Sequence, residues 1–239
     1  MDRVRRLIRA RLKSFLQSGS TTATNAATPM TSKPDSRSPL NQHTPRILVG
    51  ISGASGVIYG IRLLELLQPT VIETHLVMSR TAEQTLAYET DRKLKEVKAL
   101  ADQVHAPDDL AAAISSGSFQ TMGMIVAPCS VKTLAEIATG VTTTLISRAA
   151  DVTLKERRRL VLMVRETPLH AGHLKNMQAA TEIGAIIAPP VPAMYARPQS
   201  LEEMVDHSLG RVLDLFGIDT GRILRWGSDS KRRGRPKRK

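Results

Sequence analysis

Short apolar runs alternate with longer amphipathic segments through the middle of the chain. The short runs are rich in Val, Ile and Leu, which is typical of strands that are buried on both faces. The longer segments repeat apolar residues every three or four positions, as helices packed on one side do. The pattern predicts strands over 46–51, 71–78, 124–127, 160–164 and 185–188, and helices over 57–67, 81–88, 108–114, 130–139, 145–157, 173–183 and 201–216.

This alternation predicts an α/β fold, a doubly wound parallel sheet of the Rossmann-like or flavodoxin-like kind. We expect one domain over residues 46–227. Residues 1–45 are predicted to form a disordered basic arm, because residues 18–45 are rich in Ser, Thr, Asn and Pro and lack apolar periodicity. Residues 228–239 form a basic C-terminal tail.

The composition agrees with one domain and restricts its core. Of the 239 residues, 41% are hydrophobic but only 3% are aromatic, so the core must consist of Leu, Ile, Val, Ala and Met. The single cysteine, Cys129, excludes an intrachain disulfide and fits a reducing compartment. The sequence has no apolar run long enough to span a membrane.

The net charge of +12 is concentrated at the two ends of the chain. Residues 1–46 carry nine Lys or Arg against two Asp, and residues 231–239 carry seven Lys or Arg and no acidic residue, so residues 47–230 have a net charge of −2. This near-neutral part is unsuited to hold a nucleic acid by bulk charge. Residues 232–237 resemble an AT-hook, which follows the minor groove of A·T-rich DNA, but a solvated basic tail is the simpler interpretation.

The N-terminal arm leaves two interpretations open. Residues 1–17 can form a basic amphipathic helix, and an Arg-rich, Ser-rich, acid-poor segment is typical of a mitochondrial transit peptide. A solvated arm of a bacterial protein has the same composition. The second interpretation, which we favour, predicts a cytoplasmic protein, and the first predicts a mitochondrial one.

A glycine-rich turn connects the first predicted strand to the first helix. Gly50, Gly53 and Gly56 have the spacing G-x-x-G-x-x-G. In a strand–turn–helix unit, glycines let the backbone approach a phosphate, and free N–H groups at the helix start point toward it. A tight turn without a ligand is the alternative, because the dinucleotide-binding spacing is G-x-G-x-x-G.

Polar side chains also follow other predicted strands at their ends. Ser79, Ser130 and the pair Arg165-Glu166 each come after an apolar run. The carboxyl ends of parallel strands share one edge, where ligands bind, so we expect a site for an anionic ligand beside a proton-handling group. Cys129 has no nearby His or Asp partner in the sequence and is expected to be a buried apolar side chain.

Two other clusters can be interpreted in more than one way. Arg148, Asp151 and Lys155 share one helix face, either as a solvated face with ion pairs or as a group in which Lys155 reaches a phosphate and Asp151 orients Arg148. His170 and His173 lack a third ligand of suitable spacing, so no metal site is predicted.

An ordered set of segments resembles the UbiX-type flavin prenyltransferases, a family with the flavoprotein Cys-decarboxylase-like fold. Each segment alone is unspecific, whereas the whole set in this order is specific. The segments are SGASG (52–56), YETD (88–91), SGS (116–118), APCSVKTL (127–134), RAADV (148–152), LKERR (154–158), VRETPL (164–169), HLKNM (173–177), PPVPAMY (189–195) and RW (225–226).

The resemblance implies an enzyme that joins the dimethylallyl group of dimethylallyl phosphate to N5 and C6 of reduced FMN without a metal. It also implies a homo-oligomer, commonly a dodecamer, and a UbiD-type decarboxylase that receives the prenylated FMN, as in ubiquinone biosynthesis. The alternative on the same fold is an FMN-dependent aromatic-acid decarboxylase.

Three sets of site residues follow from the resemblance. Protons would move through Ser55, Glu89 and Glu166, and Lys155 would act with the fixed cations Arg165 and Arg211 on the leaving phosphate. FMN would be held by Gly53, Ala54, Ser55, Ser79, Ser130, Val131, Lys132, Thr133 and Arg165. The isoprenyl phosphate would be held by Ser116, Arg148, Lys155, Arg165, Tyr195 and Arg211.

Overall fold

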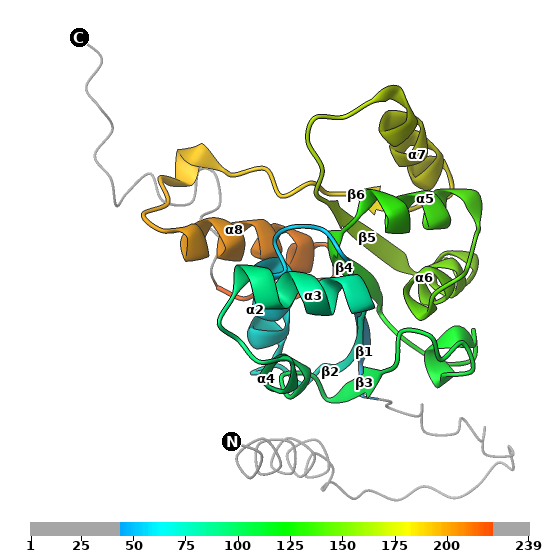
Figure 1. The fold of residues 1–239 in the computed structure, drawn as a ribbon. Coiled ribbons are helices and arrows are strands. Elements are labelled where there is room, and N and C mark those ends of the chain that lie inside the picture. Colours follow the sequence, from blue (N-terminus) through cyan, green and yellow to red (C-terminus); the bar gives the residue numbers. More distant parts are fainter. Residues whose placement is uncertain (1–43, 222–239) are drawn as a thin grey trace, which may run out of the picture. The chain divides into compact units, whose positions relative to one another are not determined.

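The computed structural model describes residues 44–221 (Figure 1). The N-terminal arm up to residue 43, the AT-hook-like segment and Arg225-Trp226 lie outside the described residues. The described residues therefore include most of the domain predicted over residues 46–227.

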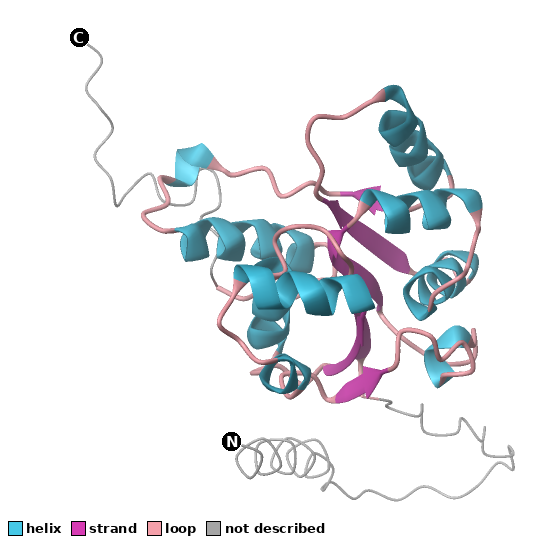
Figure 2. Cartoon of the chain, viewed as in Figure 1, coloured by secondary structure: helices cyan, strands magenta, loops and turns pink. Residues whose placement is uncertain are grey.

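One six-stranded parallel sheet organises these residues (Figure 2). Its strands pair in the order β3-β2-β1-β4-β5-β6, which is the strand order of the Rossmann fold and confirms the predicted doubly wound sheet. The strands are β1 (Arg46–Ile51), β2 (Glu73–Met78), β3 (Gln103–His105), β4 (Gly123–Cys129), β5 (Arg159–Val164) and β6 (Ile186–Ile187).

Helices cover both faces of the sheet (Figure 1). Neighbouring residues of a strand enter different cores: Ile47 and Val49 of β1 belong to one, and Leu48 belongs to the other. This two-sided burial is the reason why the strands appear in the sequence as continuous apolar runs. The first face carries α2 (Ile58–Leu67), α3 (Arg80–Glu89), α4 (Leu94–Lys98) and α8 (Leu201–Asp214), and the second carries α5 (Val131–Thr139), α6 (Leu145–Lys155) and α7 (Ala171–Glu182).

The chain changes direction across the sheet between β1 and β4. The connection after β1 passes through α2 on the first face, and the connection after β4 passes through α5 on the second face. The two loops diverge as they leave neighbouring strands, which is the arrangement that opens a ligand site in doubly wound sheets.

Two strands differ from the sequence prediction. The edge strand β3 was not predicted, because it is short and has no apolar run; Asp102 just before it accepts hydrogen bonds from the N–H and hydroxyl of Thr74 at 2.9 and 3.0 Å. β4 was expected to end before Pro128 but continues to Cys129, since the pairing with β5 is irregular between Val126 and Cys129. A proline is tolerated at such an irregularity because no ladder N–H is required there.

The prediction of a helix over residues 108–114 is also wrong. The segment forms turns followed by a short 3₁₀ helix, Ala113–Ser115. The Asp109 carboxylate accepts the N–H of Ala111 at 3.2 Å, a local bond that favours a turn over a helix. The other predicted elements are present, with bounds shifted by a few residues.

Helix α8 is attached to α2 by an ion pair as well as by apolar contacts. Arg62 donates from Nε and Nη2 to the two Asp206 carboxylate oxygens at 2.6 and 3.0 Å, and from Nη1 to Glu65 at 2.8 Å. Leu64 of α2 and Leu213 of α8 belong to the same core.

Within residues 44–221, none of the helices is long and apolar enough to cross a bilayer.

Replacing Leu64 by alanine should destabilise the fold by about 2–5 kcal/mol, because a fully buried side chain would leave a cavity between α2 and its neighbours. Urea unfolding followed by circular dichroism measures the change. Leu174→Ala is the control, since Leu174 is 54% exposed and its loss should cost far less. Equal effects of the two substitutions would contradict the assignment of Leu64 to the core.

Candidate functional site

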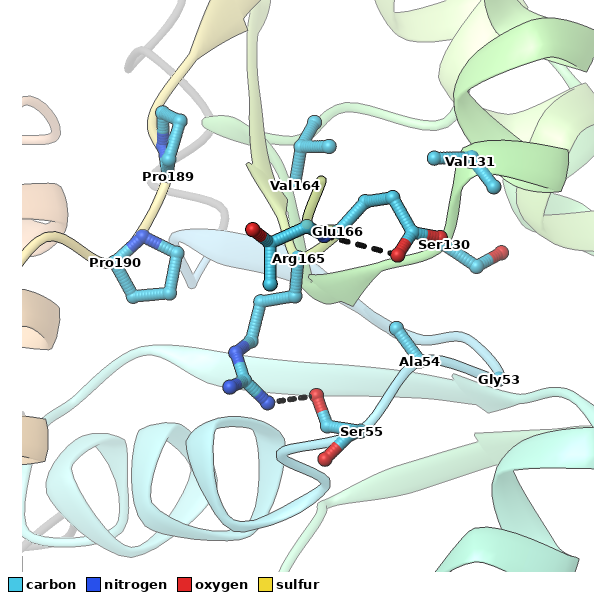
Figure 3. A pocket seen from close by; sticks show the side chains of 11 residues that line it. Gly53, Ala54, Ser55, Ser130, Val131, Val164, Arg165, Glu166, Pro189 and Pro190 are labelled. Atoms are coloured by element: carbon cyan, nitrogen blue, oxygen red, sulfur yellow. Dashed lines mark hydrogen bonds between the residues drawn. The ribbon is translucent and has the colours of Figure 1, made fainter. Parts of the chain in front are cut away.

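A cavity of about 590 Å³ lies at the carboxyl edge of the sheet (Figure 3). The turn after β1, the start of α5 and the segment after β5 form its wall, and two prolines after β6 complete it. Its volume is in the usual range of small-molecule sites. The lining residues are Gly53, Ala54, Ser55, Ser130, Val131, Val164, Arg165, Glu166, Thr167, Pro189 and Pro190.

The two loops that diverge at β1 and β4 are joined beneath this cavity by Ser52. Its hydroxyl donates to the Pro128 carbonyl at 2.9 Å and accepts the N–H of Ser130 at 2.7 Å. Its own N–H donates to the Pro128 carbonyl at 3.1 Å. No role was predicted for Ser52, although its position directly after the last apolar residue of the strand was an available signal.

Two glycines of the turn are required by close approaches. A Cβ at Gly53 would lie 2.5 Å from Thr81 in the first turn of α3. Gly56 has φ +95°, and a Cβ there would lie 2.2 Å from the Arg165 guanidinium. Gly56 is therefore required both by its positive φ and by the Arg165 guanidinium, which leaves no room for a side chain, and Gly53 is required by the close approach of Thr81.

Arg165 brings a positive charge into the cavity. Its guanidinium donates to the Ser55 carbonyl and lies 5.7 Å from the centre of the Tyr59 ring (Figure 3 shows the Ser55 contact). Its N–H donates to the Cys129 carbonyl at 3.1 Å, which fixes its backbone to the end of β4. Within the described residues, Arg165 is the only Lys or Arg that lines this cavity. The sequence did not indicate the contact with Tyr59, a residue of α2.

The start of α2 is occupied by a carboxylate, which corrects the expected position of a phosphate. Oε2 of Glu89, the last residue of α3, accepts the N–H groups of Gly56 and Val57 at 2.7 and 3.0 Å. Burial alone would raise the pKa of Glu89, but hydrogen bonds from Ser55, Gly56 and Val57 and the charge of Arg165 outweigh it and lower this pKa. The N–H groups that we expected to meet a phosphate are therefore already bound to Glu89.

The predicted segment 130–133 contributes unequally to the cavity. Ser130 and Val131 line it. Ser130 also begins α5 as its N-cap, since its Oγ accepts the Thr133 N–H at 3.2 Å. Lys132 does not line the cavity; its Nζ donates to Glu136 at 2.5 Å. Ser79 is likewise an N-cap, of α3, and accepts the Ala82 N–H at 3.1 Å.

Glu166 places a carboxylate in the cavity wall. Its Oε1 accepts the N–H of Thr167 at 2.9 Å, and its side chain belongs to the segment after β5. Ser55 and Glu166 thus come from different loops, and each presents an oxygen to the same cavity (Figure 3).

Ser116, Arg148 and Lys155 are not brought to this cavity within the chain. Arg158, just after Lys155, donates to the Gly117 carbonyl at 2.7 Å, and β5 then begins at Arg159. Ser116 and Lys155 therefore lie near the amino edge of the sheet, whereas Arg165 follows the carboxyl end of β5. Six residues of strand separate these edges by roughly 17 Å.

The helix face that carries Arg148 has the ion pair expected from the sequence. Arg148 donates to Asp151 at 2.8 Å and to the Ser115 carbonyl at 3.4 Å, and Lys155 pairs with Glu156. This arrangement agrees with the expectation that Asp151 orients Arg148, and it fixes Arg148 against the loop that contains Ser116.

Tyr195 and Arg211 lie outside the cavity lining as well. The Tyr195 hydroxyl is 3.4 Å from Nε2 of His207, and Arg211 donates to Asp214 at 2.9 Å. Both contacts involve α8, the helix that packs on α2.

Cys129 is fully buried, as predicted, and burial raises the pKa of its thiol. A thiol in this environment is a poor nucleophile at neutral pH. The rings of His170 and His173 are stacked with centroids 3.6 Å apart, and His170 accepts the Gly172 N–H at the start of α7. Among residues 44–221, no group of three or more His, Cys, Asp or Glu is placed to hold a metal ion.

Proteins with similar sequences bind flavin. The Flavoprotein family model matches residues 35–213. Over 174 residues the chain is 63% identical to the flavin prenyltransferase UbiX of Escherichia coli, which covers 72% of this chain and 92% of the relative.

Two solved structures have the same fold at high sequence identity. AnUbiX in complex with FMN and dimethylallyl pyrophosphate has a TM-score of 0.76 and 55% identity, over 77% of this chain and 98% of that one. A dodecameric FMN-dependent Ubix-like decarboxylase from Escherichia coli has a TM-score of 0.74 and 49% identity, over 76% of this chain and 98% of that one.

Replacing Glu89 by glutamine should remove a pH-dependent contribution to stability. Because the folded pKa of Glu89 lies below its ordinary value of 4.5, the carboxylate stabilises the fold above that value and loses this effect as the pH falls through the folded pKa. The melting temperatures of wild type and Glu89→Gln should differ most at neutral pH and converge in acid. Glu89→Asp, which keeps the charge, should retain the trend; a difference that is constant with pH would contradict it.

Proposed function

The chain belongs to the UbiX-type flavin prenyltransferases of the Flavoprotein family, and from this premise we propose that it joins the dimethylallyl group of dimethylallyl phosphate to N5 and C6 of reduced FMN. The observation that carries the proposal is the meeting of one cation, Arg165, with the Ser55–Glu89 pair and with Glu166 at one cavity.

The cavity suits a flavin. The turn approaches α3 so closely at Gly53 that only a residue without a Cβ fits, which leaves the backbone of this turn at the cavity wall. We propose that Gly53, Ala54, Ser55, Ser130 and Val131 hold FMN by their backbone and hydroxyl groups and that Arg165 binds its negative charge. Ser79, the N-cap of α3, and Lys132 and Thr133, in the first turn of α5, would contribute to the FMN site from outside the cavity lining.

The protein's own groups must take up the protons that are displaced as two bonds form. Reduced FMN supplies the nucleophilic N5 and C6. Glu89, whose pKa is lowered, is ionised at neutral pH and can act as a base, and its hydrogen bond with Ser55 connects it to a hydroxyl in the cavity wall. We propose that Ser55 and Glu89 receive the proton from N5 as the carbon–oxygen bond to phosphate breaks. Bond formation at C6 consumes the prenyl double bond, so one alkene carbon takes up a proton, which Ser55 and Glu89 return, while Glu166 receives the proton that leaves C6.

The leaving phosphate requires fixed cations, and one chain supplies too few. Arg165 lines the cavity, but Lys155 and Ser116 lie near the opposite edge of the sheet. We therefore infer that Ser116, Arg148 and Lys155 act in the cavity of a neighbouring subunit. A related structure is dodecameric, which supports an assembly in which such an exchange can occur. Tyr195 and Arg211 would complete the phosphate site from the α8 side. Developing charge can then be stabilised without a metal.

An FMN-dependent aromatic-acid decarboxylase is the weaker alternative, although two of the related structures are named decarboxylases, one of them a phenylacrylic acid decarboxylase. Loss of carbon dioxide gives Lys155, Arg165 and Arg211 no evident role, whereas phosphate release requires cations. The family resemblance further suggests a UbiD-type decarboxylase as the recipient of the product and a cytoplasmic setting. DNA binding by the C-terminal tail stays a secondary hypothesis.

The reaction is tested by incubating the protein anaerobically with reduced FMN and dimethylallyl phosphate. Mass spectrometry should show a flavin that is heavier by one dimethylallyl unit. Glu166→Gln should still bind FMN but form this product about 10² times more slowly or worse, because a positioned base is lost. Glu182→Gln, on α7 outside the cavity lining, is the control and should keep the wild-type rate. An unchanged flavin mass with the wild type would contradict the function.

The exchange between subunits is tested by mixing inactive variants. Lys155→Ala and Arg165→Ala should each be nearly inactive alone, but co-expressed and co-assembled subunits should regain activity, since some cavities then have both cations. Arg165→Ala mixed with Glu166→Gln is the matched control, because both residues line the cavity of the same chain and no mixed site is complete. No recovery in the first mixture would show that Lys155 does not act across subunits.

A further inference from the structure

Ser52 lies just beyond the carboxyl end of the parallel ladder between β1 and β4. The two strands pair from Leu48 with Met124 to Gly50 with Val126. Beyond that point the chains diverge into the turn after β1 and the start of α5. The next contact between them is made by Ser52: its N–H donates to the Pro128 carbonyl, and its hydroxyl, rather than a backbone carbonyl, accepts the Ser130 N–H.

The hydroxyl of Ser52 both donates and accepts across this gap. It donates to the Pro128 carbonyl and accepts the Ser130 N–H at 2.7 Å, the shortest of the three bonds that Ser52 makes here. Ser52 is 1% exposed, so its hydroxyl makes both bonds in a buried environment, whereas Ser130 itself is partly buried and lines the cavity. The hydroxyl is therefore the group that fixes Ser130 at this position.

The chain segments on both sides of the hydrogen bond between Ser52 and Ser130 line the cavity. Gly53, Ala54 and Ser55 follow Ser52 directly, and Ser130 is the residue that its hydroxyl holds. Ser52 itself does not line the cavity, so its effect on a ligand must pass through these segments.

We propose that Ser52 is a positioning residue for flavin binding: its hydroxyl sets the separation and register of the two segments that would bind FMN, the turn after β1 and the start of α5. This inference rests on the proposed flavin site and adds to it a residue that does not touch the ligand. A purely structural hydroxyl would contribute to stability alone, whereas Ser52 sets the geometry of the site.

Thr74 provides a matched control elsewhere in the sheet. It is also 1% exposed, and its hydroxyl also donates and accepts, to the Asp102 carboxylate and from the Asp102 N–H, each at 3.0 Å. It connects β2 to the residue before β3 at the amino edge, away from the cavity. Loss of either hydroxyl removes a buried bridge between neighbouring segments, but only Ser52 connects segments that line the cavity.

The experiment compares Ser52→Ala, Ser52→Thr and Thr74→Val in the full-length protein. FMN affinity is measured by quenching of flavin fluorescence, well below the melting temperature of every variant, and thermal unfolding is recorded alongside. Ser52→Ala should bind FMN roughly tenfold more weakly, the effect of about one net hydrogen bond. Thr74→Val should lower the melting temperature but leave FMN affinity within about twofold of wild type. Ser52→Thr, which keeps the hydroxyl, should restore most of the affinity.

Wild-type affinity in Ser52→Ala would overturn the inference, and so would equal losses of affinity in Ser52→Ala and Thr74→Val. If Ser52→Thr binds as weakly as Ser52→Ala while remaining folded, the hydroxyl is not the group responsible. A wild-type protein that binds FMN but does not prenylate it would contradict the proposed function alone, because the affinity comparison needs only bound FMN.

Discussion

The parting of β1 and β4 is the constraint on which the site depends. Neighbouring parallel strands that send their connections to opposite faces must separate, and the backbone groups at the separation lose their ladder partners. Here the Ser52 N–H keeps one backbone bond to the Pro128 carbonyl, and the Ser52 hydroxyl bonds both to that carbonyl and to the Ser130 N–H. The glycine turn and the N-cap of α5 follow directly from this point, so the cavity walls are continuous with the most buried part of the sheet.

The carboxylate and the guanidinium near this opening come from different elements, α3 and the segment after β5. Glu89 occupies the N-terminus of α2, where a phosphate would otherwise be expected, and its pKa is lowered by the hydrogen bonds it receives there. Arg165 passes beneath Gly56 and supplies the positive charge to the cavity. In a generic strand–turn–helix unit, the start of the helix binds an anionic ligand. Here the start of α2 binds the Glu89 carboxylate instead, and the positive charge in the cavity wall comes from Arg165.

The sequence predicted the sheet and the main helices because two-sided burial produces continuous apolar runs, as in β1 and β5. It missed β3, whose short edge pairing depends on Asp102 and Thr74, and it ended β4 too early because a proline is tolerated at an irregular pairing. For the site, the strand ends indicated Ser130, Arg165 and Glu166, which line one cavity together with Ser55 of the glycine turn, but they also indicated Ser79, which caps α3 and does not line the cavity. The Glu89 cap, the Tyr59 contact and the separation of Lys155 from Arg165 depend on three-dimensional packing between elements distant in sequence, which residue spacing does not encode.

Within one chain, Arg165 and Glu166 line the cavity, whereas Lys155 lies near the opposite edge of the sheet. If prenyl transfer and phosphate release are one reaction in this cavity, the two products must form in equal amounts. In an anaerobic single-turnover experiment, protein loaded with reduced FMN is mixed with dimethylallyl phosphate, and inorganic phosphate and flavin mass are measured in the same sample. One phosphate should be released for each flavin that gains one dimethylallyl unit. Phosphate release without a change in flavin mass would show that the two events are not coupled.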